Sequence, residues 1–297
     1  MRRWLPVATV VVLVLAFGPA GAAQESAVAV FAPCSDCHDT VVNDFLVNPH
    51  ARDFLATRGA DGTTVCASCH GDGSKHAEEG GDKTLIKVPG GAAGAAACQS
   101  CHGGGREQFA ARHGAHSANA VTCEACHTVH QAKPARARLL KNEPTALCAS
   151  CHPDQRGMFR RPYGHNLEQF GEAGVACISC HNPHGAGGAT SLKVSDLGEG
   201  PCASCHADKT GPFVFTHVTG IAGDCLSCHE PHGSTNPKAL TRPRVDQLCL
   251  ECHTGLQAGT LGSQPPSLHD LRSPRYTNCT TCHVAVHGSN SSPLLLK

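Results

Sequence analysis

The stretch Cys225-Leu226-Ser227-Cys228-His229-Glu230-Pro231-His232-Gly233 places two cysteines and two histidines within nine positions. Its first five residues follow the pattern C-x-x-C-H, in which a histidine comes directly after the second cysteine. This pattern is the attachment signature of c-type haem, because two thiols can form thioether bonds to one porphyrin while the histidine binds its iron.

The pattern occurs ten times, and its copies use all 20 cysteines of the 297-residue chain. The predicted thioether-forming residues are Cys34, Cys37, Cys66, Cys69, Cys98, Cys101, Cys123, Cys126, Cys148, Cys151, Cys177, Cys180, Cys202, Cys205, Cys225, Cys228, Cys249, Cys252, Cys279 and Cys282. The predicted proximal iron ligands are His38, His70, His102, His127, His152, His181, His206, His229, His253 and His283. Zinc sites and redox disulfides also use C-x-x-C, but neither requires the following histidine in every copy. The sequence therefore predicts ten covalently bound haem c groups.

Eleven further histidines are available for the second face of each iron. A methionine ligand is nearly excluded by number, because Met158 is the only methionine besides Met1. Two histidines per iron are therefore predicted, with a choice between His113 and His116, which precede Cys123 by 10 and seven residues. The longer spacing favours His113, since the upstream histidines of the more C-terminal units precede their site by eight to 12 residues. The candidate distal ligands are His50, His76, His113, His130, His165, His184, His217, His232, His269 and His287.

The histidines reveal a repeat of two haem sites. A unit consists of an upstream histidine, a haem site, a second histidine and a second haem site; it occurs four times, with one haem site added at each end. A histidine three residues after a proximal ligand, such as His232, starts on the same side of that ring and is expected to serve a different haem. Upstream histidines such as His165 and His217 could serve the haem site that follows them.

The composition indicates a protein built around its cofactors. Aromatic residues make up 4% of the chain, and it contains 32 glycines and 19 prolines. Ten porphyrins would supply the missing apolar surface, at roughly 25 cal/mol per Å² buried. The predicted fold is a multihaem cytochrome c, mostly irregular with short α-helices and little β-structure. Short helices are expected at the attachment sites, because cysteines at i and i+3 then share one face.

The beginning of the chain predicts export. Arg2 and Arg3, the apolar run at residues 7–17 and the small residues at 20–23 form a predicted signal peptide over residues 1–23. The alternative, a retained membrane anchor, is disfavoured because this run is shorter than the ~20 residues that cross a bilayer. The mature chain is expected in the periplasm. A net charge of +0 and the lack of a basic patch argue against a nucleic-acid partner.

Beyond its ten sites, the chain resembles the decahaem cytochromes of the MtrA/DmsE type. The matching stretches are residues 66–76 with Gly80-Gly81-Asp82, the Pro-His-Gly turns at His184 and His232, and His287-Gly288-Ser289-Asn290. The resemblance implies an elongated chain of stacked, bis-histidine haems in two pentahaem halves, residues 24–160 and 161–297. It also implies association with an outer-membrane β-barrel porin. The electron partners implied are a periplasmic or inner-membrane cytochrome and an extracellular multihaem cytochrome or reductase.

The leading functional hypothesis is electron relay between the periplasm and the outer membrane or cell exterior, with no catalytic residue and no enzymatic activity. The first alternative is a multihaem oxidoreductase with one haem open to substrate. The second is a self-assembling haem filament. The number of histidines favours relay, because it leaves no iron without a second ligand.

Overall fold

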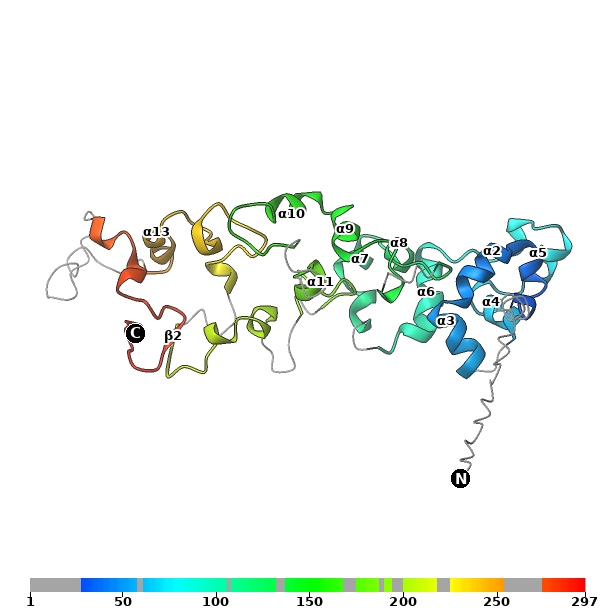
Figure 1. Ribbon diagram of the computed structural model, residues 1–297, viewed down its shortest axis with the longest axis horizontal. Helices are drawn as coiled ribbons and strands as arrows, with labels where there is room; N and C mark the ends of the chain where they lie inside the picture. The colour runs from blue at the N-terminus through cyan, green and yellow to red at the C-terminus, as the bar shows by residue number, and fades with distance from the viewer. Residues whose placement is uncertain are drawn as a thin grey trace, which may run out of the picture. The chain divides into compact units, whose positions relative to one another are not determined.

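The computed structural model describes residues 28–57, 61–105, 108–131, 137–167, 175–186, 190–193, 200–217, 225–253 and 274–296 (Figure 1). The predicted signal peptide and His269 lie outside these ranges. Within them, no helix is both long and apolar enough to cross a membrane.

Short helices carry most of the described secondary structure, which confirms the predicted fold class. The α-helices are α2 (Cys34–Leu46), α3 (Pro49–Arg52), α4 (Gly62–His70), α5 (Ser74–Glu78), α6 (Gly91–His102), α7 (Ala115–Ala118), α8 (Cys123–Cys126), α9 (Pro144–Ala149), α10 (Pro153–Met158), α11 (Cys177–Cys180) and α13 (Val245–Leu250). Single turns of 3-10 helix are η2 (Lys83–Leu85), η3 (Phe109–Arg112), η4 (Ala137–Leu139), η6 (Pro201–Ser204), η7 (Ala207–Lys209), η8 (Cys225–Ser227), η9 (Pro237–Ala239), η10 (Pro274–Tyr276) and η11 (Cys279–Thr281). One π-helical turn, η1 (Asp53–Thr57), follows α3.

Local sequence explains where several helices begin. Asp61 caps α4, since its side chain accepts the backbone N–H of Thr64 at 2.8 Å. Pro144 and Pro153 occupy the first positions of α9 and α10, where the missing N–H of proline costs no helical hydrogen bond.

The chain divides into two compact units. The first unit comprises Met1–Ala97 and His127–Leu139, and the second comprises Cys98–Cys126 and Leu140–Lys297. The predicted pentahaem halves concern a different property, the distribution of haems along the chain, and they stay a prediction.

The first unit contains a small apolar core. Phe31, Val42 and Val65 are buried against one another, and the rings of Phe31 and Phe45 meet edge to face with centroids 6.2 Å apart. Gly62 permits this packing, because a Cβ there would lie 2.6 Å from the Phe31 ring. Helices α2 and α4, each carrying an attachment site, are thereby held together.

The second unit has no buried hydrophobic side chain among its described residues. The side chains buried there belong to Ser234, Asp246 and Ser289. Because burial of apolar surface stabilises a fold, this distribution is in line with the expectation that cofactors form much of the core.

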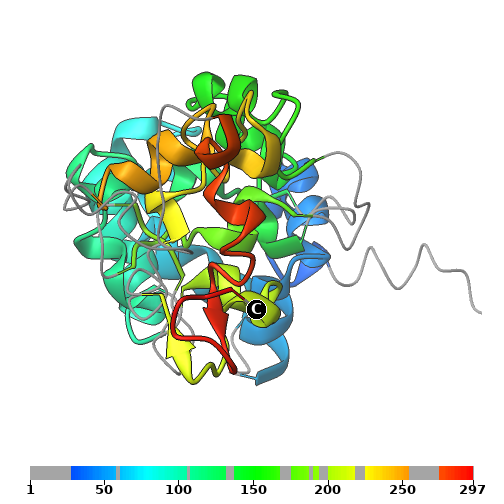
Figure 2. The same ribbon diagram turned by 90° about the vertical axis from the view of Figure 1, so that its left-hand side faces the viewer.

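Similar crossings of the chain recur in the second unit, and we call them joints. Strand β1 (Phe215–Thr216) pairs antiparallel with β2 (Gly288–Ser289), close to the C-terminal end of the chain (Figures 1 and 2). Residues 163–165 cross residues 231–234 in the same way, since Tyr163 and Ser234 exchange backbone hydrogen bonds of 3.1 and 2.6 Å. Residues 114–116 meet residues 183–185 without a bridge, and a Cβ on Gly114 would lie 3.2 Å from the Cα of Gly185. Each joint brings an upstream histidine beside a His-Gly turn far along the chain.

Candidate functional site

Every attachment motif begins within a short helix, and in five motifs the helix also includes the second cysteine, which agrees with the short helices expected at several sites. Helices α8 and α11 span a cysteine pair from first to last residue, and α4 and α6 end on the histidine of their motif. None of the 20 cysteines forms a disulfide. Both sulfurs of each motif are therefore available to one cofactor.

Five proximal histidines are oriented by a hydrogen bond from the outer ring nitrogen, Nδ1. A backbone carbonyl has no proton to give, so Nδ1–H must be the donor in each case. The bonds run from His70 to Lys87 (2.8 Å), His127 to Arg138 (2.8 Å), His181 to Thr190 (2.8 Å), His229 to Lys238 (2.9 Å) and His283 to Leu294 (2.7 Å). Protonation at Nδ1 leaves Nε2 with its lone pair, which is the form that binds a metal ion.

Four of these carbonyls belong to loops with the same unusual backbone. The residue after the acceptor has a positive φ in each: 56° at Leu139, 49° at Ser191, 54° at Ala239 and 56° at Leu295. Non-glycine residues in this region are uncommon and cost about 1–3 kcal/mol. The repetition of this conformation beside four proximal rings indicates that it serves to aim the carbonyl.

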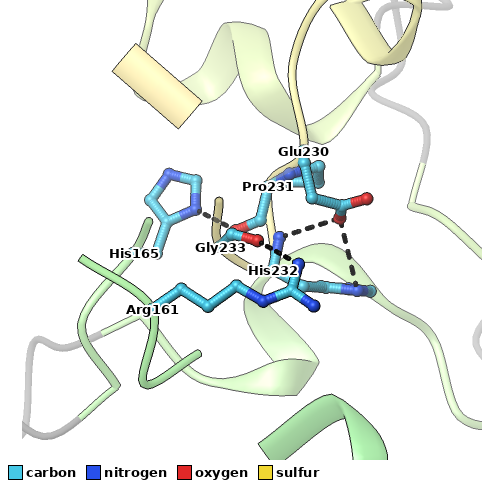
Figure 3. Close-up of polar contacts among 6 residues, drawn as sticks. All are labelled: Arg161, His165, Glu230, Pro231, His232 and Gly233. Carbon is cyan, nitrogen blue, oxygen red and sulfur yellow. Dashed lines mark hydrogen bonds and ion pairs between the residues drawn. The ribbon is translucent and has the colours of Figure 1, made fainter. Parts of the chain in front are cut away.

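Three candidate distal histidines carry the same kind of bond. Nδ1 of His76 donates to the carbonyl of Asp82 at 2.9 Å, that of His116 to Pro183 at 2.9 Å and that of His165 to Pro231 at 3.1 Å. Figure 3 shows the last of these at the joint beside His232. The joints thus fix the tautomer of two distal candidates.

Seven proximal histidines face a second histidine from outside their own motif. The ring-centroid separations are 6.2 Å for His38 and His76, 5.7 Å for His70 and His130, 6.2 Å for His152 and His116, 6.0 Å for His181 and His232, 6.2 Å for His206 and His165, 6.3 Å for His229 and His287, and 6.2 Å for His253 and His217. A metal–imidazole bond is about 2.0–2.1 Å and the nitrogen lies ~1.1 Å from the ring centre, so two axial imidazoles have centroids about 6.2–6.4 Å apart. Five pairs have separations of 6.2–6.3 Å, within this range, and the pairs His70–His130 and His181–His232 are 0.2–0.5 Å closer than its lower end.

The pairs follow a rule that the sequence did not reveal. A histidine that comes just after an attachment site lies opposite the proximal histidine of an earlier site. His232, for example, follows His229 but faces His181. An upstream histidine faces the proximal histidine of the second site after it and not of the first. His165 precedes Cys177 but faces His206. His217 precedes Cys225 but faces His253. The expectation for His232 agrees with this geometry, whereas the interpretation of the upstream histidines does not.

The structure also reverses the preference between two candidates. His116, and not His113, faces a proximal histidine, because its position on α7 lets Nδ1 reach the Pro183 carbonyl across the joint. His50 donates its Nδ1 hydrogen toward Asn48 Oδ1 at 3.1 Å, and the backbone N–H of His184 donates to Asn182 at 3.1 Å. The remaining candidate, His269, lies outside the described residues.

Burial favours the uncharged form of several distal candidates. It lowers the pKa of His130, His217, His232 and His287, with a smaller contribution in each case from a facing histidine. A neutral imidazole is the form that can donate electrons to a metal ion.

Thiols of successive motifs lie close together. In the first unit, burial and the hydrogen-bonded thiol of Cys34 raise the pKa of Cys66 to about 12. In the second unit the neighbouring thiols are Cys126 and Cys151, Cys148 and Cys177, Cys180 and Cys205, Cys202 and Cys225, Cys228 and Cys249, and Cys249 and Cys279. A row of seven attachment sites, from Cys123 to Cys279, is therefore linked neighbour to neighbour.

In the described part of the chain, no three His, Cys, Asp or Glu side chains converge as a metal site would require. The histidines meet in twos, which suits the two axial positions of a haem iron.

Comparison with known proteins agrees with this geometry. Residues 27–75, 113–157, 171–211 and 217–258 match the family model of a doubled CXXCH motif. Over 237 residues the chain is 34% identical to the multiheme cytochrome MtrA of Shewanella baltica (strain OS185), covering 76% of this chain and 68% of that protein. The chain belongs to the MtrA-type multihaem c-type cytochromes.

The doubled motif corrects the repeat at one point. Three matched ranges coincide with predicted two-site units, but the first combines the sites at Cys34 and Cys66, whereas the sequence repeat had grouped Cys66 with Cys98. The structure agrees with the family model, because Cys34 contacts Cys66 and His76 faces His38. The sequence repeat had placed Cys66 with Cys98 because His50, upstream of Cys66, was interpreted as the first histidine of that unit.

This multihaem cytochrome binds haem c covalently and transfers electrons. Its cysteine pairs would form the thioethers, and its facing histidines would provide two nitrogen ligands for an iron bound between them. Bound in this way, a haem undergoes one-electron oxidation and reduction.

Proposed function

We propose that the chain is a decahaem cytochrome that relays electrons between the periplasm and the outer membrane or cell exterior. The observation that carries this proposal is the set of seven facing histidine pairs. An iron held by protein on both faces has no position for a substrate, so electron exchange is its main chemistry.

The proposed ligand set extends the same arrangement to all ten motifs. The proximal ligands are the ten C-x-x-C-H histidines, and the 20 cysteines form the thioethers. His116 replaces His113 in the predicted distal set, because it is the one that faces His152. His50, His184 and His269 complete the set with the seven histidines already described as facing a proximal ring.

Contacts between successive motifs support a continuous path. Interacting thiols of successive motifs support consecutive haems that would lie near one another along the row from Cys123 to Cys279. The joints add a second connection, because each proposed distal ligand is carried by a segment next to another attachment site. Electrons would then pass along the row without leaving the protein.

We further propose that residues 1–23 direct export and are removed, and that the mature protein works as two pentahaem halves, residues 24–160 and 161–297. It would lie within or against an outer-membrane β-barrel porin. A periplasmic or inner-membrane cytochrome would serve one end, and an extracellular multihaem cytochrome or reductase the other. The membership in the MtrA-type family supports this assignment.

Reconstitution tests the relay. The cytochrome and its β-barrel partner are inserted into liposomes that contain an oxidised redox dye, and a reductant that cannot cross the bilayer is added outside. We expect the internal dye to be reduced, whereas liposomes that hold the barrel alone should keep it oxidised. An oxidised dye in liposomes with the assembled complex would contradict the proposal.

A further inference from the structure

Three turns in the chain share the pattern X-Pro-His, and in each the side chain of X accepts a hydrogen bond from the backbone of the histidine. They are residues 48–50, 182–184 and 230–232. In each turn a side-chain oxygen of the first residue accepts the backbone N–H of the histidine, at 2.9 Å for Asn48, 3.1 Å for Asn182 and 3.4 Å for Glu230. This bond stabilises the turn. The turns differ in the first residue, which is asparagine in two and glutamate in the third.

The glutamate places a negative charge beside a proposed iron ligand. Glu230 Oε1 lies 3.9 Å from the outer nitrogen, Nδ1, of His232 (Figure 3). The two side chains are 35% and 30% exposed, so water screens the charge only in part. In the described part of the chain no lysine or arginine forms an ion pair with Glu230. The nearby Arg161 donates its hydrogen bond to the carbonyl of Gly233 at 3.1 Å instead.

A carboxylate in this position acts on the metal through the ligand. At 3.9 Å the carboxylate is too far from Nδ1 for a hydrogen bond, so it acts through its charge. Negative charge beside the imidazole makes the ring a stronger electron donor, which favours ferric over ferrous iron. The negative charge itself acts in the same direction, because the oxidised centre carries one more positive charge. An uncharged asparagine oxygen also accepts the hydrogen bond that stabilises the turn, but it favours ferric iron much less than a carboxylate does.

We infer that Glu230 is a positioning residue that lowers the reduction potential of the haem held between His181 and His232. This inference rests on the proposed bis-histidine ligation of that haem. Glu230 thereby makes one member of the row harder to reduce than it would be with an asparagine in its place. The haem at Cys177 would then have a lower reduction potential than it would have without the carboxylate, and this difference would affect electron transfer along the row.

A potentiometric titration of the full-length holoprotein tests this inference. Glu230→Gln removes the charge and keeps an oxygen for the turn, and Glu230→Asn reproduces the sequence of the two sibling turns. Glu143→Gln is the matched control, because it also removes one carboxylate, from the residue before α9, whose side chain makes no capping hydrogen bond. Haem content and the low-spin absorption spectrum are measured for every variant.

In both Glu230 variants we expect one component, a tenth of the total absorbance change for ten haems, to move to higher potential. An increase of about tenfold in its reduction equilibrium constant corresponds to 59 mV for a one-electron couple. The control should give the wild-type curve. Unchanged curves in fully loaded, low-spin Glu230 variants would overturn the inference and leave the relay intact. High-spin haem in the wild-type protein would instead overturn the proposed function.

Discussion

At the scale of single residues, the tautomer of each histidine decides whether it can bind iron. Backbone carbonyls bonded to Nδ1 hold five proximal rings and three distal candidates in the form with a free Nε2 lone pair. The C-x-x-C-H motif identifies the proximal residues from sequence alone, because attachment chemistry requires that spacing. It gives no information about the distal residues, since their partners lie up to about 60 residues away in the chain, as with His70 and His130.

The choice between His113 and His116 gives the sharpest test at this scale. Replacing His116 with alanine should remove the distal ligand of the haem at Cys148, because His116 is the residue that faces His152. The haem stays attached through its thioethers, and about a tenth of the total haem should become high-spin in the ferric spectrum. The same replacement of His113 is the control and should leave a low-spin spectrum. A high-spin change in the His113 variant alone would reverse the assignment.

At the scale of elements, the joints connect segments of the chain that carry different attachment sites. Each joint brings a His-Gly turn against a segment about 70 residues away, as with Tyr163 and Ser234. The glycine is required there: Gly233 has a φ of 128°, and a Cβ on it would lie 2.2 Å from the carbonyl oxygen of Met158. The turn at His232 therefore has room for no other residue at this position.

Substitution of Gly233 should disturb a ligand that it does not itself provide. Gly233→Ala places a methyl group against Met158, and the positive φ adds about 1–3 kcal/mol of strain. We expect a lower thermal unfolding temperature and partial loss of the low-spin signal at the site of His181, which His232 faces. Gly157→Ala, at a helical position with no neighbouring atom within 4 Å, is the control. It should be neutral or stabilising by roughly 0.5–1 kcal/mol. Equal behaviour of the two variants would contradict the role of the joint.

Some of these elements follow from the sequence and others depend on distant contacts. Short helices at the cysteine pairs were predicted correctly, because spacing of i and i+3 is a local property. The sequence predicted neither the joints nor the loops whose carbonyls accept the Nδ1–H of the proximal histidines. They depend on backbone contacts over long separations, and the residues with positive φ in those loops, such as Leu139 and Leu295, have no glycine to mark them.

At the scale of the whole molecule, the protein obtains its core in two ways. The first unit buries Phe31, Val42 and Val65 in a conventional apolar cluster. In the second unit the described buried side chains are the polar Ser234, Asp246 and Ser289. Low aromatic content predicted a core made of cofactors, and the second unit conforms to that expectation.

The central claim is that two histidines hold every iron, and the ferric spin state tests it most directly. The oxidised, full-length protein is examined by electron paramagnetic resonance, and its covalent haem is counted by the alkaline pyridine assay. We predict ten haems per chain and low-spin ferric signals that account for all of them. A high-spin signal equivalent to one haem or more would contradict the claim, because it would show an iron with an open position.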